Sequence, residues 1–314
     1  MRIASIDVGS NTVLLLVAEV GPDGAVTPIY EEDRFARLGE GVDRTGRLSD
    51  AAMERAMTAL RAYRSKADEL GTETIVIGAT SASRDASNTS ELARQAKDEL
   101  GLEYRVIAGE TEAALSFLGA ASAFPHFPAV AVLDVGGGSA EIVRGTPAGM
   151  ETRQSLDVGA VRLTERCFAP DGKREPVPSA EQVIHAERTV DEALGALDFD
   201  LMADGRPLPL LGASGTARVL GHLAGAGDPL AFIPAADLRA WRDRLLGLPP
   251  AETLALNPDV LVGREDVFAA GVLIVERVVK RFGLEGIWPS PRGLRHGLAL
   301  DWARRAVATG ALRG

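Results

Sequence analysis

A short pattern that occurs twice places the strongest constraint on the fold of this chain. In each copy an apolar run ends in an aspartate, a glycine-containing turn follows, and a second strand-like run leads away. The copies are IDVGSNT at residues 6–12 and LDVGGGSAE at residues 133–141, so Asp7 and Asp134 are 127 residues apart. That spacing is close to the length of one domain. The repeat therefore predicts two copies of one architecture that face each other across a cleft.

The periodicity around each copy predicts an α/β protein, in which a strand meander precedes alternating strands and helices. In the first half we expect strands at 2–8, 11–20, 26–35, 74–79 and 104–108 and helices over 49–70, 90–100 and 110–123. In the second half we expect strands at 129–135, 140–144 and 209–211 and a helix over 265–282. A strand follows the first glycine turn where a Rossmann fold would have a helix.

The segment FPHFP at residues 124–128 interrupts the alternation and predicts a domain boundary. We expect an N-terminal domain over residues 1–123 and a second domain over residues 124–296. A last helix over residues 297–314 is expected to pack on the first domain.

Composition limits the classes of function. The chain has no long uncharged apolar run and no apolar leader after Met1, and Cys167 is its single cysteine, which predicts a cytoplasmic protein without a membrane span. The net charge of −10 argues against binding to nucleic acid. A polyanionic substrate would need a metal ion and a local cluster of basic side chains to offset this charge. Arginine, which suits bidentate contacts to phosphate, makes up 30 of the 34 basic residues.

The two glycine turns are candidate phosphate loops. Without a Cβ, the backbone N–H groups of a glycine turn can approach an anion closely. Asp7 and Asp134 precede the turns at strand ends, where carboxylates can hold Mg²⁺. One such turn alone is more typical of an ordinary hairpin, but two matched copies favour phosphate binding.

These motifs and four others resemble those of the exopolyphosphatase and guanosine-pentaphosphate phosphatase family. The others are ATSASRD at 79–85, IAGETEA at 107–113, GASGT at 212–216 and GLRHG at 293–297, in family order over nearly the whole chain. The resemblance implies the actin-like fold, with two ribonuclease-H-like domains around an interdomain cleft. It also implies a homodimer and the short form of the family, without the C-terminal HD-type domain of longer relatives.

The resemblance further implies a set of site residues. Glu112 is the catalytic base, Arg84 contacts phosphate, and Mg²⁺ is held near Asp7, Asp134 and Glu141. The remaining phosphate-binding residues are Gly9, Ser10, Asn11, Thr12, Gly136, Gly137, Gly138, Ser139 and Ser214.

Several of these residues have simpler explanations. A glutamate in the first turn of a helix is common because it interacts favourably with the helix dipole, and Arg84 could be a solvated loop charge. Arg264 and Arg295 lie in similar motifs, but either could form an interdomain salt bridge, so neither is placed in the site. Leu14 and Ala114 replace polar residues of many relatives, and two contacts to phosphate or water are therefore missing.

Four functions follow as hypotheses. The first is Mg²⁺-dependent release of terminal orthophosphate from inorganic polyphosphate, and the second is hydrolysis of guanosine pentaphosphate by the same groups. The third is an actin-like kinase that uses ATP to phosphorylate a small acceptor. The fourth is a non-catalytic regulator that binds polyphosphate or a nucleotide, against which intact Glu112, Asp7 and Asp134 argue.

Overall fold

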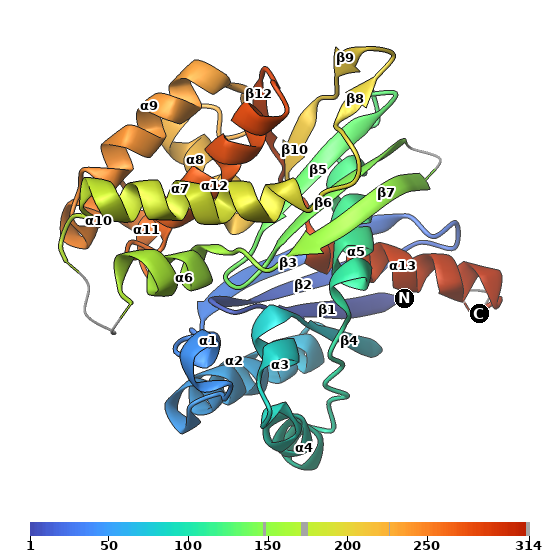
Figure 1. The fold of residues 1–314 in the computed structure, drawn as a ribbon. Coiled ribbons are helices and arrows are strands. Elements are labelled where there is room, and N and C mark those ends of the chain that lie inside the picture. The colour runs from blue at the N-terminus through green and yellow to red at the C-terminus, as the bar shows by residue number, and fades with distance from the viewer. Residues whose placement is uncertain (147–148, 171–174, 226, 312–314) are drawn as a thin grey trace. The chain divides into compact units, whose positions relative to one another are not determined.

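The computed structural model describes residues 1–146, 149–170, 175–225 and 227–311 (Figure 1). The chain divides into two compact units. Unit 1 comprises Met1–Gly119 and Arg292–Gly314, and unit 2 comprises Ala120–Pro291. Among the residues with a described position, no helix is long and apolar enough to cross a membrane.

Unit 1 contains a four-stranded sheet in the order β3-β2-β1-β4. The strands are β1 (Arg2–Val8), β2 (Thr12–Val20), β3 (Val26–Phe35) and β4 (Thr74–Ala79). β1, β2 and β3 form an antiparallel meander, and β4 pairs with β1 in parallel. These four strands confirm the predicted ones.

The strand predicted at residues 104–108 was wrong. Only Val106 forms a bridge, with Ala79. Tyr104 instead packs against the hydrophobic core, with its hydroxyl 2.7 Å from the Ser83 hydroxyl. A pattern of apolar residues does not reveal that this run pairs at one position only.

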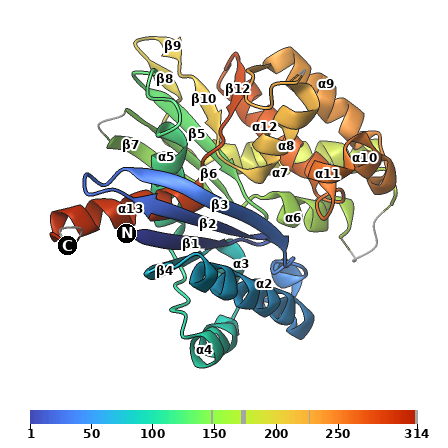
Figure 2. The same ribbon diagram turned by 180° about the vertical axis from the view of Figure 1, so that it is seen from behind.

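Helices cover both faces of this sheet (Figures 1 and 2). The helices of unit 1 are α1 (Val42–Thr45), α2 (Asp50–Glu69), α3 (Ser81–Asp85), α4 (Thr89–Leu100), α5 (Gly109–Ala121, which extends two residues into unit 2) and α13 (Leu294–Ala308). Ser49 caps α2 by accepting a hydrogen bond from the Ala52 N–H. On the opposite face, Ile3 and Leu16 of the sheet pack with Ala299 and Ala303 of α13.

The last helix starts earlier than predicted, at Leu294 instead of residue 297. Gly297 lies within α13, and its position requires glycine because α5 passes directly beside it. A Cβ built on Gly297 would lie 1.9 Å from the Leu115 carbonyl oxygen, and one on Gly119 would lie 2.1 Å from the Gly293 carbonyl oxygen. These glycines permit close packing of α5 and α13.

Unit 2 contains a six-stranded sheet in the order β11-β12-β10-β5-β6-β7. The strands are β5 (Val130–Val135), β6 (Ala140–Thr146), β7 (Gly149–Leu156), β10 (Leu210–Gly212), β11 (Ile233–Pro234) and β12 (Gly286–Pro289). The series β7-β6-β5-β10 has the same order and the same pairing directions as β3-β2-β1-β4. The repeat in sequence is therefore a repeat in structure.

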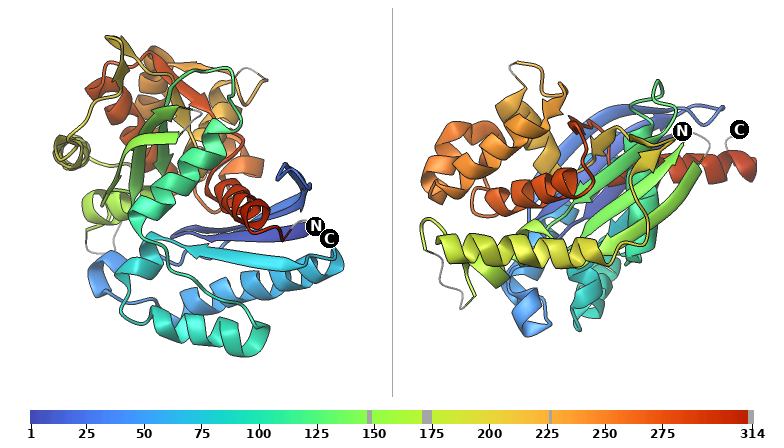
Figure 3. Two further views of the ribbon diagram at one scale, coloured as in Figure 1. Left: turned by 90° about the vertical axis from the view of Figure 1, so that its right-hand side faces the viewer. Right: turned by 45° about the horizontal axis from the view of Figure 1, so that its top comes forward.

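Helices and one small hairpin complete unit 2. They are α6 (Ala160–Leu163), a π-helical turn (Thr164–Phe168), α7 (Ala180–Gly195), α8 (Gly215–Ala224), α9 (Ala235–Leu246), α10 (Pro250–Leu256), α11 (Pro258–Leu261), α12 (Phe268–Arg281) and the strands β8 (Met202–Ala203) and β9 (Arg206–Pro207). α12 is almost entirely buried and packs against α7 and α9 (Figure 3).

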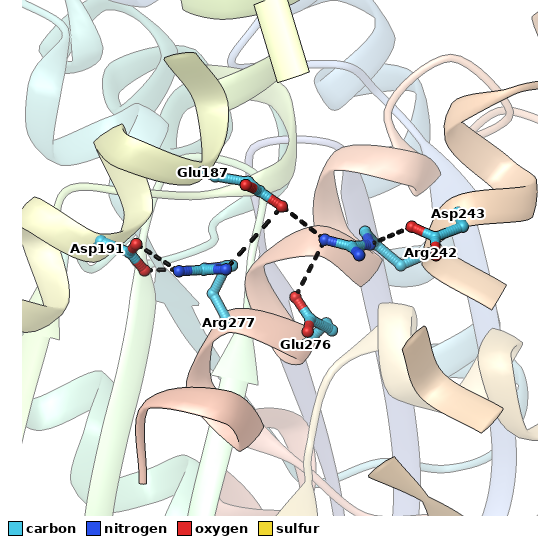
Figure 4. A network of polar contacts seen from close by, with 6 residues as sticks. All are labelled: Glu187, Asp191, Arg242, Asp243, Glu276 and Arg277. Atoms are coloured by element: carbon cyan, nitrogen blue, oxygen red, sulfur yellow. Dashed lines mark hydrogen bonds and ion pairs between the residues drawn. The ribbon is translucent and has the colours of Figure 1, made fainter. Parts of the chain in front are cut away.

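An ionic network joins these three helices (Figure 4). Arg242 of α9 donates to Glu187 of α7 at 2.6 Å and to the buried Glu276 of α12 at 3.4 Å. Arg277 of α12 pairs with Asp191 of α7. The network gives the buried Glu276 a cationic partner and links α7, α9 and α12.

Candidate active site

Loop 1, residues 7–12, is a tight turn between β1 and β2. The Gly9 N–H donates to the Thr12 carbonyl at 3.0 Å. A Cβ on Gly9 would lie 2.9 Å from that same oxygen, so the turn requires glycine. The Ser10 carbonyl accepts a hydrogen bond of 2.7 Å from the Gly39 N–H, and this bond ties the loop to the segment after β3.

Loop 2, residues 134–139, repeats this construction between β5 and β6. The Gly136 N–H donates to the Ser139 carbonyl at 2.9 Å, and the Gly137 carbonyl accepts from the Val161 N–H at 2.8 Å. Gly159 lies so close that a Cβ there would be 2.5 Å from the Gly137 carbonyl oxygen. Both loops are therefore held by the segment that follows the third strand of their own unit.

The carboxylates predicted to hold metal are distributed unequally. Asp134 lies directly opposite Glu141 in the β5–β6 ladder, and Glu141 is 1% exposed and accepts a hydrogen bond of 2.8 Å from the Ser155 hydroxyl. Asp7, the equivalent of Asp134, lies opposite Leu14. Within the described residues, no three or more His, Cys, Asp or Glu side chains are gathered as a metal-binding group.

Asp134 and Glu141 nonetheless suit a hard divalent cation. Directly opposite residues of an antiparallel pair have Cβ atoms about 4.5–5.5 Å apart and point to the same face, so the two side chains are neighbours on one face of the sheet. Carboxylate oxygens are the ligands that Mg²⁺ prefers. The donor set therefore fits Mg²⁺ chemically.

Glu112 and Arg84 lie together, although 28 positions separate them in the sequence. The Arg84 Nη1 donates to the Glu112 Oε2 at 2.5 Å and to the Ile107 carbonyl at 3.1 Å. Glu112 lies in the first turn of α5 and is 5% exposed. A glutamate that serves only the helix dipole would point to solvent, so this burial indicates a more specific role.

Ser214 caps α8. Its hydroxyl accepts a hydrogen bond of 3.3 Å from the Ala217 N–H, which gives it a structural function at the start of that helix. The guanidinium of Arg264 lies against the same turn, because a Cβ on Gly215 would be 2.8 Å from the Arg264 Nη1.

Arg295 forms its ion pairs within unit 1. Its guanidinium binds Asp33 at 2.6 Å and also Glu31, and its side chain is 5% exposed. The neighbouring His296 lies 3.5 Å from Glu31, and burial lowers the pKa of this histidine below its ordinary value. Arg295 therefore anchors α13 to β3.

The sequence model of the Ppx/GppA phosphatase family matches residues 16–306 of this chain. The chain belongs to the Ppx/GppA phosphatase family. It is 35% identical to Exopolyphosphatase 2 of Mycobacterium tuberculosis, over 96% of this chain and 98% of that protein. The family membership that the motifs predict is thereby confirmed.

Two solved structures support the family fold. An exopolyphosphatase from Cytophaga hutchinsonii is 25% identical and superposes with a TM-score of 0.85 over 97% of this chain and 98% of that one. The Ppx/GppA family member from Aquifex aeolicus is 29% identical, with a TM-score of 0.78 over 97% and 98% of the two chains. The predicted actin-like α/β class is confirmed by this likeness to Ppx/GppA structures.

Proposed function

We propose that this protein is an exopolyphosphatase that releases terminal orthophosphate from inorganic polyphosphate in a Mg²⁺-dependent hydrolysis. The assignment of polyphosphate as the substrate rests on the similarity to Exopolyphosphatase 2 along 96% of the chain. The buried Glu112 and the two matched glycine loops supply the groups that such a hydrolysis needs.

The loops bind phosphate in this proposal. Their glycines present main-chain N–H groups, and hydroxyl and amide side chains add donors. The binding residues are Gly9, Ser10, Asn11 and Thr12 in loop 1, Gly136, Gly137, Gly138 and Ser139 in loop 2, together with Ser214.

Glu112 acts as the general base. It orients a water molecule in line with the terminal phosphorus and accepts its proton as the phosphoanhydride bond breaks. Since little covalent chemistry falls to the protein in phosphoryl transfer, positioning of this carboxylate supplies much of the rate.

Asp7, Asp134 and Glu141 would hold Mg²⁺. When bound, the ion neutralises charge on the oxygens of the reacting phosphate. The protein's own part is to present carboxylate oxygens, and the Ser155 hydroxyl orients the Glu141 carboxylate for that task.

We expect a cytoplasmic protein that binds no membrane, and the family resemblance implies a homodimer. Nucleic acid is not expected as a partner, because the net charge of −10 repels other polyanions that lack a dedicated site.

The test is orthophosphate release from long-chain polyphosphate, short-chain polyphosphate, guanosine pentaphosphate and ATP, each with Mg²⁺ and with a chelator. The proposal predicts Mg²⁺-dependent release that is fastest from polyphosphate. Faster release from guanosine pentaphosphate would assign the second activity of the family instead. Tight ATP binding without release from polyphosphate would favour the kinase, and binding of polyphosphate without any release would favour the regulator.

A further inference from the structure

Arg84 is held in place from several sides of unit 1. It is the fourth residue of α3, the short helix that follows β4 at the carboxyl end of that strand. The Ser10 hydroxyl in loop 1 accepts a hydrogen bond of 3.2 Å from the Ala82 N–H, and the Thr80 N–H donates to the Val8 carbonyl at 3.0 Å. Loop 1 and the turn that carries Arg84 are therefore one connected structure.

The guanidinium of Arg84 is directed at the first turn of α5. One nitrogen, Nη1, contacts both the Ile107 carbonyl just before the helix and the Glu112 carboxylate within it. The main-chain contact fixes the guanidinium, and the side-chain contact then fixes the carboxylate. Because a guanidinium is planar and its N–H groups have fixed directions, this contact sets the orientation of Glu112 as well as its charge environment.

The Glu112 side chain needs such a support. A free glutamate has three rotatable bonds, and a displacement of about 1 Å at a catalytic group can cost about 100-fold in rate. Arg84 and Ser10 together connect the loop proposed to hold phosphate with the carboxylate proposed to activate water.

We propose that Arg84 is a positioning residue, which acts on hydrolysis by holding the Glu112 carboxylate and contributes little to binding of the polyphosphate chain. This inference rests on the proposed function, and it differs from the phosphate contact that the resemblance implies for Arg84. The two roles predict different kinetics, because a residue that acts through Glu112 loses its effect when Glu112 cannot act as a base.

The test is a double-mutant cycle of Arg84→Ala and Glu112→Gln, with phosphate release from long-chain polyphosphate as the readout. In the wild-type background, Arg84→Ala is expected to lower kcat about 100-fold and to change KM by less than about twofold. In the Glu112→Gln background it is expected to lower the residual rate no further. An unchanged kcat with KM raised about tenfold or more, or an equal loss of rate in both backgrounds, would overturn the proposal.

A binding measurement decides the matter even where the residual rate of Glu112→Gln is too low to follow. Glu112→Gln and the double variant are expected to bind fluorescently labelled polyphosphate with dissociation constants within about twofold of each other. A weakening of about tenfold in the double variant would assign Arg84 to the substrate chain.

Two further variants control for folding and for charge. Arg47→Ala removes an exposed arginine of unit 1 that pairs with Glu91, and it is expected to leave kcat and KM unchanged. Arg84→Lys keeps the charge but loses the planar guanidinium, and it is expected to recover only a small part of kcat. Full recovery by lysine would contradict an orienting role.

The outcomes separate this inference from the proposed function. If the wild type releases no phosphate, the function itself is wrong. If the wild type is active and Glu112→Gln is equally active, the base assignment is wrong. If Glu112→Gln alone is inactive while Arg84→Ala raises only KM, the function stands and the positioning role is wrong.

Discussion

Glu141 lies directly opposite Asp134 across β5 and β6, whereas the residue opposite Asp7 across β1 and β2 is Leu14. The two units thus share the same strand arrangement, but the side chains at these equivalent positions differ. Unit 2 supplies two neighbouring carboxylates, and unit 1 supplies one at the equivalent place. Metal binding is therefore expected to depend on Glu141, whereas Leu14 at the equivalent position has no atom that can bind a metal ion.

Glu141→Gln is expected to raise the Mg²⁺ concentration for half-maximal activity by about 10- to 100-fold, because the neutral amide is a weaker ligand for a hard cation. A titration of phosphate release with Mg²⁺ measures this. Glu151→Gln removes a more exposed carboxylate of β7 and should leave the titration unchanged. An unaltered Mg²⁺ requirement in Glu141→Gln would remove this residue from the metal site.

Much of the fold follows from local patterns. The apolar runs that end at Asp7 and Asp134 become β1 and β5, and Gly71 and Gly101 end helices in the left-handed region, as glycines commonly do. These features depend on neighbours in the sequence, so a sequence pattern contains the needed information.

Other features depend on packing between distant segments. The contact of Arg84 with Glu112 requires a particular placement of α3 against α5, and neither motif alone indicates it. Gly297 resembles a helix breaker until the backbone of Leu115 is seen beside it. Likewise, Val106 lies in a strand-like run that pairs at a single position. Tertiary contacts override the local signal in each case.

Gly297→Ala is expected to destabilise the protein by about 3 kcal/mol, near the upper end of the usual cost of overpacking, because the methyl group meets the backbone of α5 and not a flexible side chain. Activity should fall as well, since α5 carries Glu112. Gly195→Ala is the matched control, because a Cβ added to this helical glycine would meet no atom within 4 Å. That variant should gain up to about 1 kcal/mol from helix propensity. Urea denaturation measures both, and equal effects would contradict the packing role of Gly297.

Arg295→Met is expected to reduce the free energy of unfolding by about 2–4 kcal/mol. The change leaves the carboxylates of Glu31 and Asp33 without the buried guanidinium that pairs with them. Because both carboxylates are partly exposed, the expected loss of stability is no larger than that for breaking a fully buried ion pair. Arg305→Met, on the same helix in an exposed pair with Asp301, should change stability by less than about 0.5 kcal/mol. Equal losses for the two variants in urea denaturation would show that Arg295 is not an anchor.

His296 is expected to make stability fall with acidification. Burial lowers its pKa in the folded state, while Glu31 opposes and Arg295 and Arg292 reinforce that shift. Below the ordinary pKa of about 6.5 the unfolded chain therefore binds a proton that the folded chain does not, and each such proton costs up to about 1.4 kcal/mol per pH unit. His296→Gln should flatten the dependence of unfolding free energy on pH just below 6.5. Identical profiles for the wild type and His296→Gln would refute the assignment.

The most direct test of the central claim is the rate of orthophosphate release from long-chain polyphosphate by the wild type, Glu112→Gln and Glu110→Gln in the presence of Mg²⁺. Glu110 lies in the same first turn of α5 but is exposed, so it controls for the loss of a helix-dipole charge. We expect rapid release by the wild type, nearly the same rate for Glu110→Gln, and a loss of at least about 100-fold for Glu112→Gln. Release by Glu112→Gln at the wild-type rate would contradict it.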